Sequence, residues 1–225
     1  MASVLEPVAF DPAVFRRELS EFDALLRSDS ALRERDEVIP FFKKRKHLTA
    51  YIGTLSLRVA VASEVCFEFD ISGNFRADVL LGSRAAGQFC VVEFEPGDEA
   101  IFRKQDRKNP EWGARFEHAF SQIVDWFWAL EDLRKSDDFR TTFGDGEVAF
   151  TSLLVMGRDA DVSGTKRRRM AWRAKKVLID SNRVICITFD ELYAALKEKY
   201  EFYSAAAEAE KTTPAPGLPP PPLRG

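Results

Sequence analysis

The chain has 225 residues, enough for one large domain or for one domain with appendages. With 45% apolar and 12% aromatic residues, it can build a substantial core. The formal net charge of −3 excludes attraction to nucleic acid by the field of the whole molecule, so any such attraction has to come from local patches. No apolar run approaches the roughly 18 residues of a membrane span and no signal-peptide pattern begins the chain, which predicts a cytoplasmic protein without membrane contact.

A helical extension is predicted over residues 1–47. Its first helix covers residues 11–28, where Asp11 is a candidate N-cap, Pro12 suits the first helical position, and apolar residues recur at helical spacing. The basic run 43–47 closes the extension. Such a run is typical of a solvated helix end, and contact with phosphate groups is the alternative.

Strand character follows over residues 58–71. Apolar residues stand at every second position there, which predicts that Phe67, Phe69 and Ile71 share one face of a sheet. Glu68 is then expected to point to the opposite face as a surface charge.

Residues 75–95 have the pattern of a β-hairpin, because two apolar runs flank a short turn rich in small residues. With that turn centred between Ala85 and Ala86, Asp78 lies directly opposite Glu93. Residues opposite one another share a sheet face, with Cβ atoms roughly 4.5–5.5 Å apart. The hairpin therefore brings these two carboxylates together.

Glu95 lies two residues beyond Glu93, so a third carboxylate shares that face. Like charges this close destabilise a sheet and raise one another's pKa. A divalent cation would relieve the repulsion, and Mg²⁺, which is usually held by one or two carboxylates and substrate phosphates, suits such a cluster. Alternatively, Glu95 lies at a solvated strand end, since Pro96 follows it.

The strongest helical pattern covers residues 111–133, where one stripe is apolar and aromatic. Gln122 lies at the margin of this stripe, and Arg115 and His118 precede it on the same edge of the helix. The Gln122 amide either points into a cleft beside the apolar face or is partly exposed without a role.

Two stretches are rich in basic residues. The first is a predicted loop at residues 96–110 that includes Lys104, and the second, residues 163–176, holds seven basic residues within eleven positions. Binding of backbone phosphates predicts a strong salt dependence. A solvated helix face or a contact with a partner subunit is the alternative for residues 163–176.

The remaining elements complete an α/β pattern with a mixed sheet. A central strand is predicted at residues 148–156, a further strand at 184–189, and a final helix that ends near residue 208. Residues 209–225 are rich in proline and are predicted to be a disordered tail. The cysteines at positions 66, 90 and 186 lie in apolar runs without metal-ligand spacing, which predicts reduced core residues.

In their order along the chain, Asp78, the triplet 93–95 and Gln122 resemble the motif of the PD-(D/E)XK nuclease superfamily. In that superfamily an Asp on one strand and a (D/E)-X-K triplet on the next bind metal, and a following helix often adds a Gln. The later stretches 155–159 and 187–192 resemble the C-terminal part of the nuclease domain of Shedu anti-phage defence proteins.

This resemblance implies a restriction-endonuclease-like core at residues 48–208, with a mixed β-sheet flanked by helices. It implies an Mg²⁺-dependent endodeoxyribonuclease in which Asp78 and Glu93 hold the metal, Glu95 orients or deprotonates the attacking water, and Gln122 hydrogen-bonds the water or the scissile phosphate. It also implies a homo-oligomer. The basic side chains expected to contact DNA, through its backbone and without reading its sequence, are Lys104, Arg115, Arg158, Lys166, Arg167, Arg168, Arg169 and Arg173.

One residue departs from the motif, because Glu95 stands where the family has Lys. A carboxylate could act as a general base or bind a second metal, or Lys104 or another cation could supply the missing charge. Two other functions stay open: a catalytically inactive nuclease-like domain that senses DNA ends or a phage protein and signals through a partner, and a plain assembly protein with an exposed acidic triad.

Overall fold

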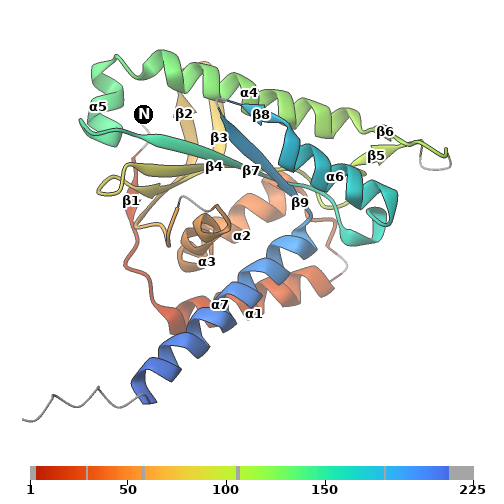
Figure 1. Ribbon diagram of the computed structural model, residues 1–225, viewed down its shortest axis with the longest axis horizontal. Coiled ribbons are helices and arrows are strands. Elements are labelled where there is room, and N and C mark those ends of the chain that lie inside the picture. Colours follow the sequence, from red (N-terminus) through yellow and green to blue (C-terminus); the bar gives the residue numbers. More distant parts are fainter. Residues whose placement is uncertain (1–3, 29, 57–58, 105–106, 180, 213–225) are drawn as a thin grey trace, which may run out of the picture.

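The fold is built on a seven-stranded mixed sheet, seen edge-on between two layers of helices in Figure 1. The computed structural model describes residues 4–28, 30–56, 59–104, 107–179 and 181–212. Strands β2, β3 and β4 form an antiparallel meander, and β4, β7 and β9 run parallel. In spatial order the strands are β1 (Glu6–Pro7), β2 (Glu64–Ile71), β3 (Phe75–Ser83), β4 (Gln88–Phe94), β7 (Ala149–Val155), β9 (Asn182–Ile187) and β8 (Leu178–Ile179). This confirms the predicted mixed α/β architecture.

Helices cover both faces of the sheet, and each face has its own hydrophobic core. The first face is covered by α4 (Ala114–Leu133), α5 (Asp137–Phe143) and α6 (Thr165–Lys176). The second is covered by α1 (Pro12–Arg27), α2 (Ile39–Lys43), α3 (Lys46–Ile52) and α7 (Phe189–Thr212), and a π-helical turn at Glu34–Val38 precedes α2. Short 3₁₀ turns lie at Gly53–Leu55 and Asp159–Asp161.

Helix α1 forms as its sequence predicts. The Asp11 carboxylate caps it by accepting hydrogen bonds from the backbone N–H groups of Ala13, at 2.7 Å, and Val14. Its buried face packs Phe15 and Phe22 against the second core. That core contains residues of the predicted extension together with residues of the sheet, so the N-terminal helices are part of the layer that supports β3 and β4.

Helix α4 begins at Ala114 rather than at residue 111. Glu111–Trp112 form strand β6, which pairs with β5 (Phe102–Arg103) inside the stretch predicted to be a loop. Of the three aromatic residues in succession at 126–128, Trp126 and Phe127 are buried in the first core, and Trp128 is exposed. The helix buries a wider face than the predicted stripe, because it crosses the width of the sheet (Figure 1).

Strand β2 does not keep the predicted alternation. It starts at Glu64, and its regular pleat breaks at Glu68, whose φ of +53° is left-handed. Phe67 therefore packs against the second core, whereas Phe69 and Ile71 pack against the first. The prediction of one shared face was wrong, because a single left-handed residue rotates the strand and exchanges its faces.

Strand β7 lies between β4 and β9 and is buried on both faces, as its nearly continuous apolar sequence predicted. The three cysteines are buried, and within the described part of the chain they form no disulfide.

At the C-terminal end, α7 continues to Thr212, so residues 209–212 of the predicted tail are helical, and residues 213–225 lie outside the described part. Among the described residues, no helix combines the length and apolarity needed to cross a bilayer.

Candidate active site

Two carboxylates meet at the end of the β3–β4 hairpin. The ladder pairs Val79 with Val92 and keeps the predicted register throughout, which brings Asp78 beside Glu93. The backbone N–H of Phe94 donates a 2.7 Å hydrogen bond to Asp78 Oδ2 and fixes that carboxylate. The predicted convergence of Asp78 and Glu93 is therefore present in the structure.

The end of β4 is held rigidly from the opposite face. The Phe94 ring stacks on Phe42 at 4.6 Å and on Phe189 at 6.1 Å, with interplanar angles of 12° and 11°. On the chain, Phe94 lies between Glu93 and Glu95, whose side chains point to the other side of the pleat. Aromatic packing in the second core thus aims both carboxylates toward α4.

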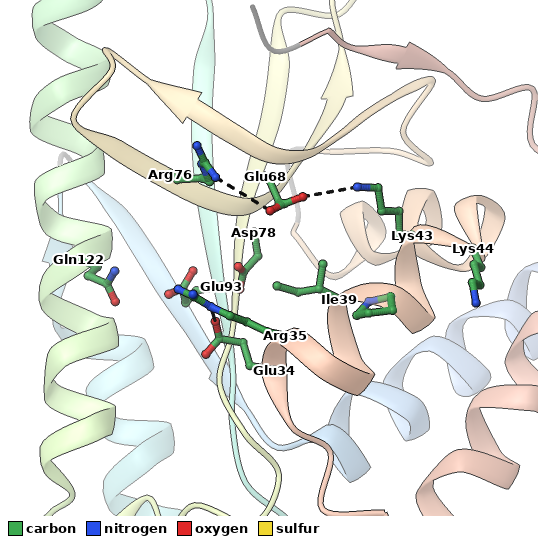
Figure 2. Close-up of a pocket in the computed structure, with 11 residues that line it drawn as sticks. Glu34, Arg35, Ile39, Lys43, Lys44, Glu68, Arg76, Asp78, Glu93 and Gln122 are labelled. Carbon is green, nitrogen blue, oxygen red and sulfur yellow. Dashed lines mark hydrogen bonds and ion pairs between the residues drawn. The ribbon is translucent and has the colours of Figure 1, made fainter. Parts of the chain in front are cut away.

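An open hollow of about 450 Å³ lies in front of Asp78 and Glu93 (Figure 2). Gln122 lines it from α4, so the helix position predicted from periodicity faces the same hollow as the two carboxylates. Glu34 and Arg35 line it from the π-helical turn. The remaining lining residues are Ile39, Pro40, Lys43, Lys44, Glu68 and Arg76.

Glu95 is buried and lies beside this hollow rather than in its wall. The Arg115 guanidinium donates to Glu95 through Nε and to Glu34, at 2.7 Å, through Nη2. Arg115 thus joins α4, β4 and the π-helical turn. Glu95 does not lie at a solvated strand end, because it is only 2% exposed and ion-paired.

Glu34 is a site residue that the sequence did not reveal. It stands among charged residues in a segment that reads as a plain helix, and no local pattern separates it from its neighbours. Only its tertiary contact with Arg115, which lies 81 positions further along the chain, identifies Glu34 as a residue of the site.

Burial raises the pKa of the carboxyl groups of Asp78, Glu93 and Glu95. It raises the pKa of Asp78 to about 7, although the Phe94 N–H opposes the shift. The pKa of Glu93 lies well above its usual value because of burial first and then the charge of Asp78. For Glu95, burial outweighs the opposing Arg115 and raises the pKa to about 6. These groups are costly to ionise without a cation.

One observation favours a cation at Asp78 and Glu93. Glu93 Oε2 is buried and has no hydrogen-bond partner among the described residues, so this oxygen is available to coordinate an ion. Within that described part, no group of three or more His, Cys, Asp or Glu side chains is placed to hold a metal ion. Two carboxylates completed by water and substrate phosphates are the usual set for Mg²⁺, and these residues fit it.

The basic residues predicted to contact DNA are mostly engaged within the protein. Lys104 pairs with Glu111 at 2.7 Å, on the surface formed by β5 and β6. Arg158 makes a bidentate pair with Asp190, with both distances 2.9 Å, and also donates to the Leu26 carbonyl. Arg158 thereby ties the end of β7 to α1 and α7.

Most arginines of α6 likewise pair within the protein, although Arg173 Nε is buried without a hydrogen-bond partner among the described residues. Arg167 pairs with Asp159 and Glu191, and Arg169 donates to the Pro110 carbonyl. Arg173 makes a bidentate pair with the carboxylate of Glu117 on α4, and its guanidinium lies 4.1 Å from the Phe120 ring centroid. Lys166 Nζ donates to the Asp161 carbonyl at 3.2 Å. On this helix Arg168, Lys175 and Lys176 are exposed.

The fold and this cluster define an α/β protein with a buried carboxylate site at the end of a sheet hairpin. The family described as Shedu protein SduA, C-terminal, matches residues 32–193, and the chain belongs to that family. This confirms the predicted resemblance to Shedu proteins, and membership suggests a part in anti-phage defence. The match begins within the predicted extension and includes Glu34. No curated protein matches the chain.

Proposed function

We propose that this protein is a metal-dependent DNA endonuclease of an anti-phage defence system, with a restriction-endonuclease-like core. The observation that carries the proposal is that Asp78, Glu93 and Gln122 line one open hollow, where Glu93 Oε2 has no hydrogen-bond partner among the residues that the structure describes. Such a set serves phosphodiester hydrolysis, since carboxylates can hold Mg²⁺ or Mn²⁺ while an amide orients water or phosphate. Family membership supports this class of function.

Asp78 and Glu93 are the residues that would hold the ion. When bound, it would polarise the phosphoryl oxygen and lower the pKa of a water molecule. The Phe94 N–H keeps the Asp78 carboxylate in place. The Gln122 side chain, on the facing helix, hydrogen-bonds the water or the scissile phosphate.

Arg115 supplies the positive charge that the lysine of the motif would otherwise bring. The sequence left open whether Lys104 or another cation does this, and Lys104 is paired with Glu111 on the β5–β6 surface. Arg115 instead binds Glu95, the residue at the lysine position, and lies on the same helix edge as Gln122. We therefore propose that Glu95 positions Arg115. This role replaces the expected one, in which Glu95 orients or deprotonates water.

The test is cleavage of linear and supercoiled DNA with Mg²⁺ and with Mn²⁺, comparing wild type with Glu93→Gln. Metal-dependent cutting by the wild type alone supports the proposal. A folded wild type that binds DNA without cutting supports a catalytically inactive sensor instead. The Glu95 substitution is the observation that favours this second function.

Assembly into a homo-oligomer is part of the proposal, and the outer face of α4 is a candidate surface for it. Val124 and Trp128, one turn apart on that face, are 40% and 66% exposed. Sedimentation of the wild type beside Trp128→Lys tests it, because a smaller species is expected only for the variant.

A further inference from the structure

Four basic side chains line the hollow in front of the carboxylates, and we call them the basic wall. Lys43 and Lys44 lie at the end of α2, Arg76 on β3, and Arg35 on the π-helical turn (Figure 2). All four are exposed. The run at residues 43–47 was expected to be a solvated helix end, with phosphate contact as the alternative, and the structure brings two of its lysines to the site.

The charges of this wall are available to a ligand. No described carboxylate lies within ion-pair distance of Lys44, and Arg35 lies 3.7 Å from the Glu34 carboxylate. Lys43 and Arg76 share a single carboxylate, that of Glu68, at the long distances of 3.4 and 4.0 Å. On α6, by contrast, most arginines are held by intramolecular hydrogen bonds.

Glu68 is placed between Lys43 and Arg76 by the break in β2. Its left-handed φ of +53° interrupts the pleat next to Asp78, and its side chain is about half exposed. A regular strand would continue its alternation there and would direct this carboxylate differently. Glu68 therefore offsets the charge of the wall when no ligand is bound.

We propose that the basic wall, rather than α6, binds the sugar-phosphate backbone of the DNA strand at the active site, and that Glu68 weakens this binding. The inference rests on the proposed function for its choice of ligand. A phosphate on the wall shares one hollow with Glu93 and Gln122, so a neighbouring phosphate reaches the carboxylates. A strand laid along α6 would instead compete with Glu117, Glu191 and Asp159 for their arginines.

The experiment measures the affinity of the full chain for a short labelled DNA duplex in EDTA, at several salt concentrations. The variant Lys43→Ala/Lys44→Ala should weaken binding and flatten the slope of log affinity against log salt by about 1 for each lost phosphate contact. Glu68→Gln should strengthen binding, because it frees Lys43 and Arg76. The matched controls are Lys197→Ala and Glu201→Gln, from an exposed ion pair of similar accessibility on α7, and both should leave the affinity unchanged.

A triple variant on the exposed face of α6, Arg168→Ala/Lys175→Ala/Lys176→Ala, completes the design. The inference is overturned if this variant flattens the salt slope and the α2 variant does not, or if neither does. Loss of affinity with both variants keeps the wall as a DNA contact but overturns the exclusion of α6, because both surfaces then bind the backbone. Cleavage is scored separately with Mg²⁺. If the wild type binds the duplex through the wall but does not cut it, the result contradicts the nuclease function alone. If the wild type cuts the duplex and Lys43→Ala/Lys44→Ala binds it with unchanged affinity and salt slope, the result contradicts the wall alone.

Discussion

The carboxylate hollow and helix α6 are both densely charged, yet they differ in how their charges are satisfied. On α6, Arg173 is held by Glu117 and by aromatic rings, and Arg167 is held by two carboxylates. In the hollow, beside Asp78, one buried oxygen of Glu93 has no hydrogen-bond partner in the described part of the chain. Charge that is already neutralised contributes to packing, whereas charge left unsatisfied at a cost in stability is available for a ligand.

Removing one carboxylate of the hollow should have the largest effect. Asp78→Asn should lower the rate of DNA cleavage on the order of 10²–10³-fold, because a bound ion contributes several kcal/mol to the transition state. The same variant should unfold at a higher temperature in EDTA, since it removes a buried charge next to Glu93. Cleavage rates and thermal melting measure the two effects. Full activity of the variant would show that Asp78 is not a ligand.

Replacing Arg115, the positively charged side chain bound to Glu95, should have the next largest effect. Arg115→Ala should slow cleavage roughly 10–100-fold, because it removes the positive charge that Glu95 holds at the site. Arg115→Lys should recover part of that rate, because the lysine restores the positive charge near Glu95. Both variants should bind DNA with nearly wild-type affinity, measured in EDTA. Equal activity of the Ala and Lys variants would contradict the assigned part of Arg115.

The hollow should also make stability depend on pH. Burial raises the pKa of Asp78 to about 7 in the folded state, and the unfolded chain releases this proton near its usual pKa of 3.8. Between these values the folded state binds more protons, so stability falls as pH rises from about 4 to about 7. We expect a loss on the order of 2–4 kcal/mol, measured by denaturant unfolding in EDTA. Asp78→Asn should reduce the slope of the free energy of unfolding against pH. An unchanged slope would show that other groups cause the pH dependence.

A substitution on helix α6 should change the stability of the protein and not its activity. Arg173→Ala removes a bidentate pair with Glu117 and the guanidinium packed 4.1 Å from Phe120, which should lower the free energy of unfolding by about 1–3 kcal/mol. The cleavage rate of the folded fraction should stay unchanged. Lost DNA binding at unchanged stability would return Arg173 to the nucleic-acid interface.

The sequence by itself determined the parts that depend on local periodicity. Alternation and the turn at Ala85–Ala86 fixed the register that brings Asp78 and Glu93 together, and a helical stripe put Gln122 at the margin of its helix. The Asp11 cap and the doubly buried β7 follow from the same kind of pattern.

Only the tertiary structure decided which charges are paired. Glu34 and Arg115 are 81 positions apart, and no pattern in either segment indicates that Arg115 pairs with both Glu34 and Glu95. The face exchange at Glu68 depends on one backbone angle that the alternating sequence does not encode. Ion pairs of this kind are set by distance in space, so the same arginine-rich composition yields a satisfied helix at α6 and an open basic wall beside the carboxylates.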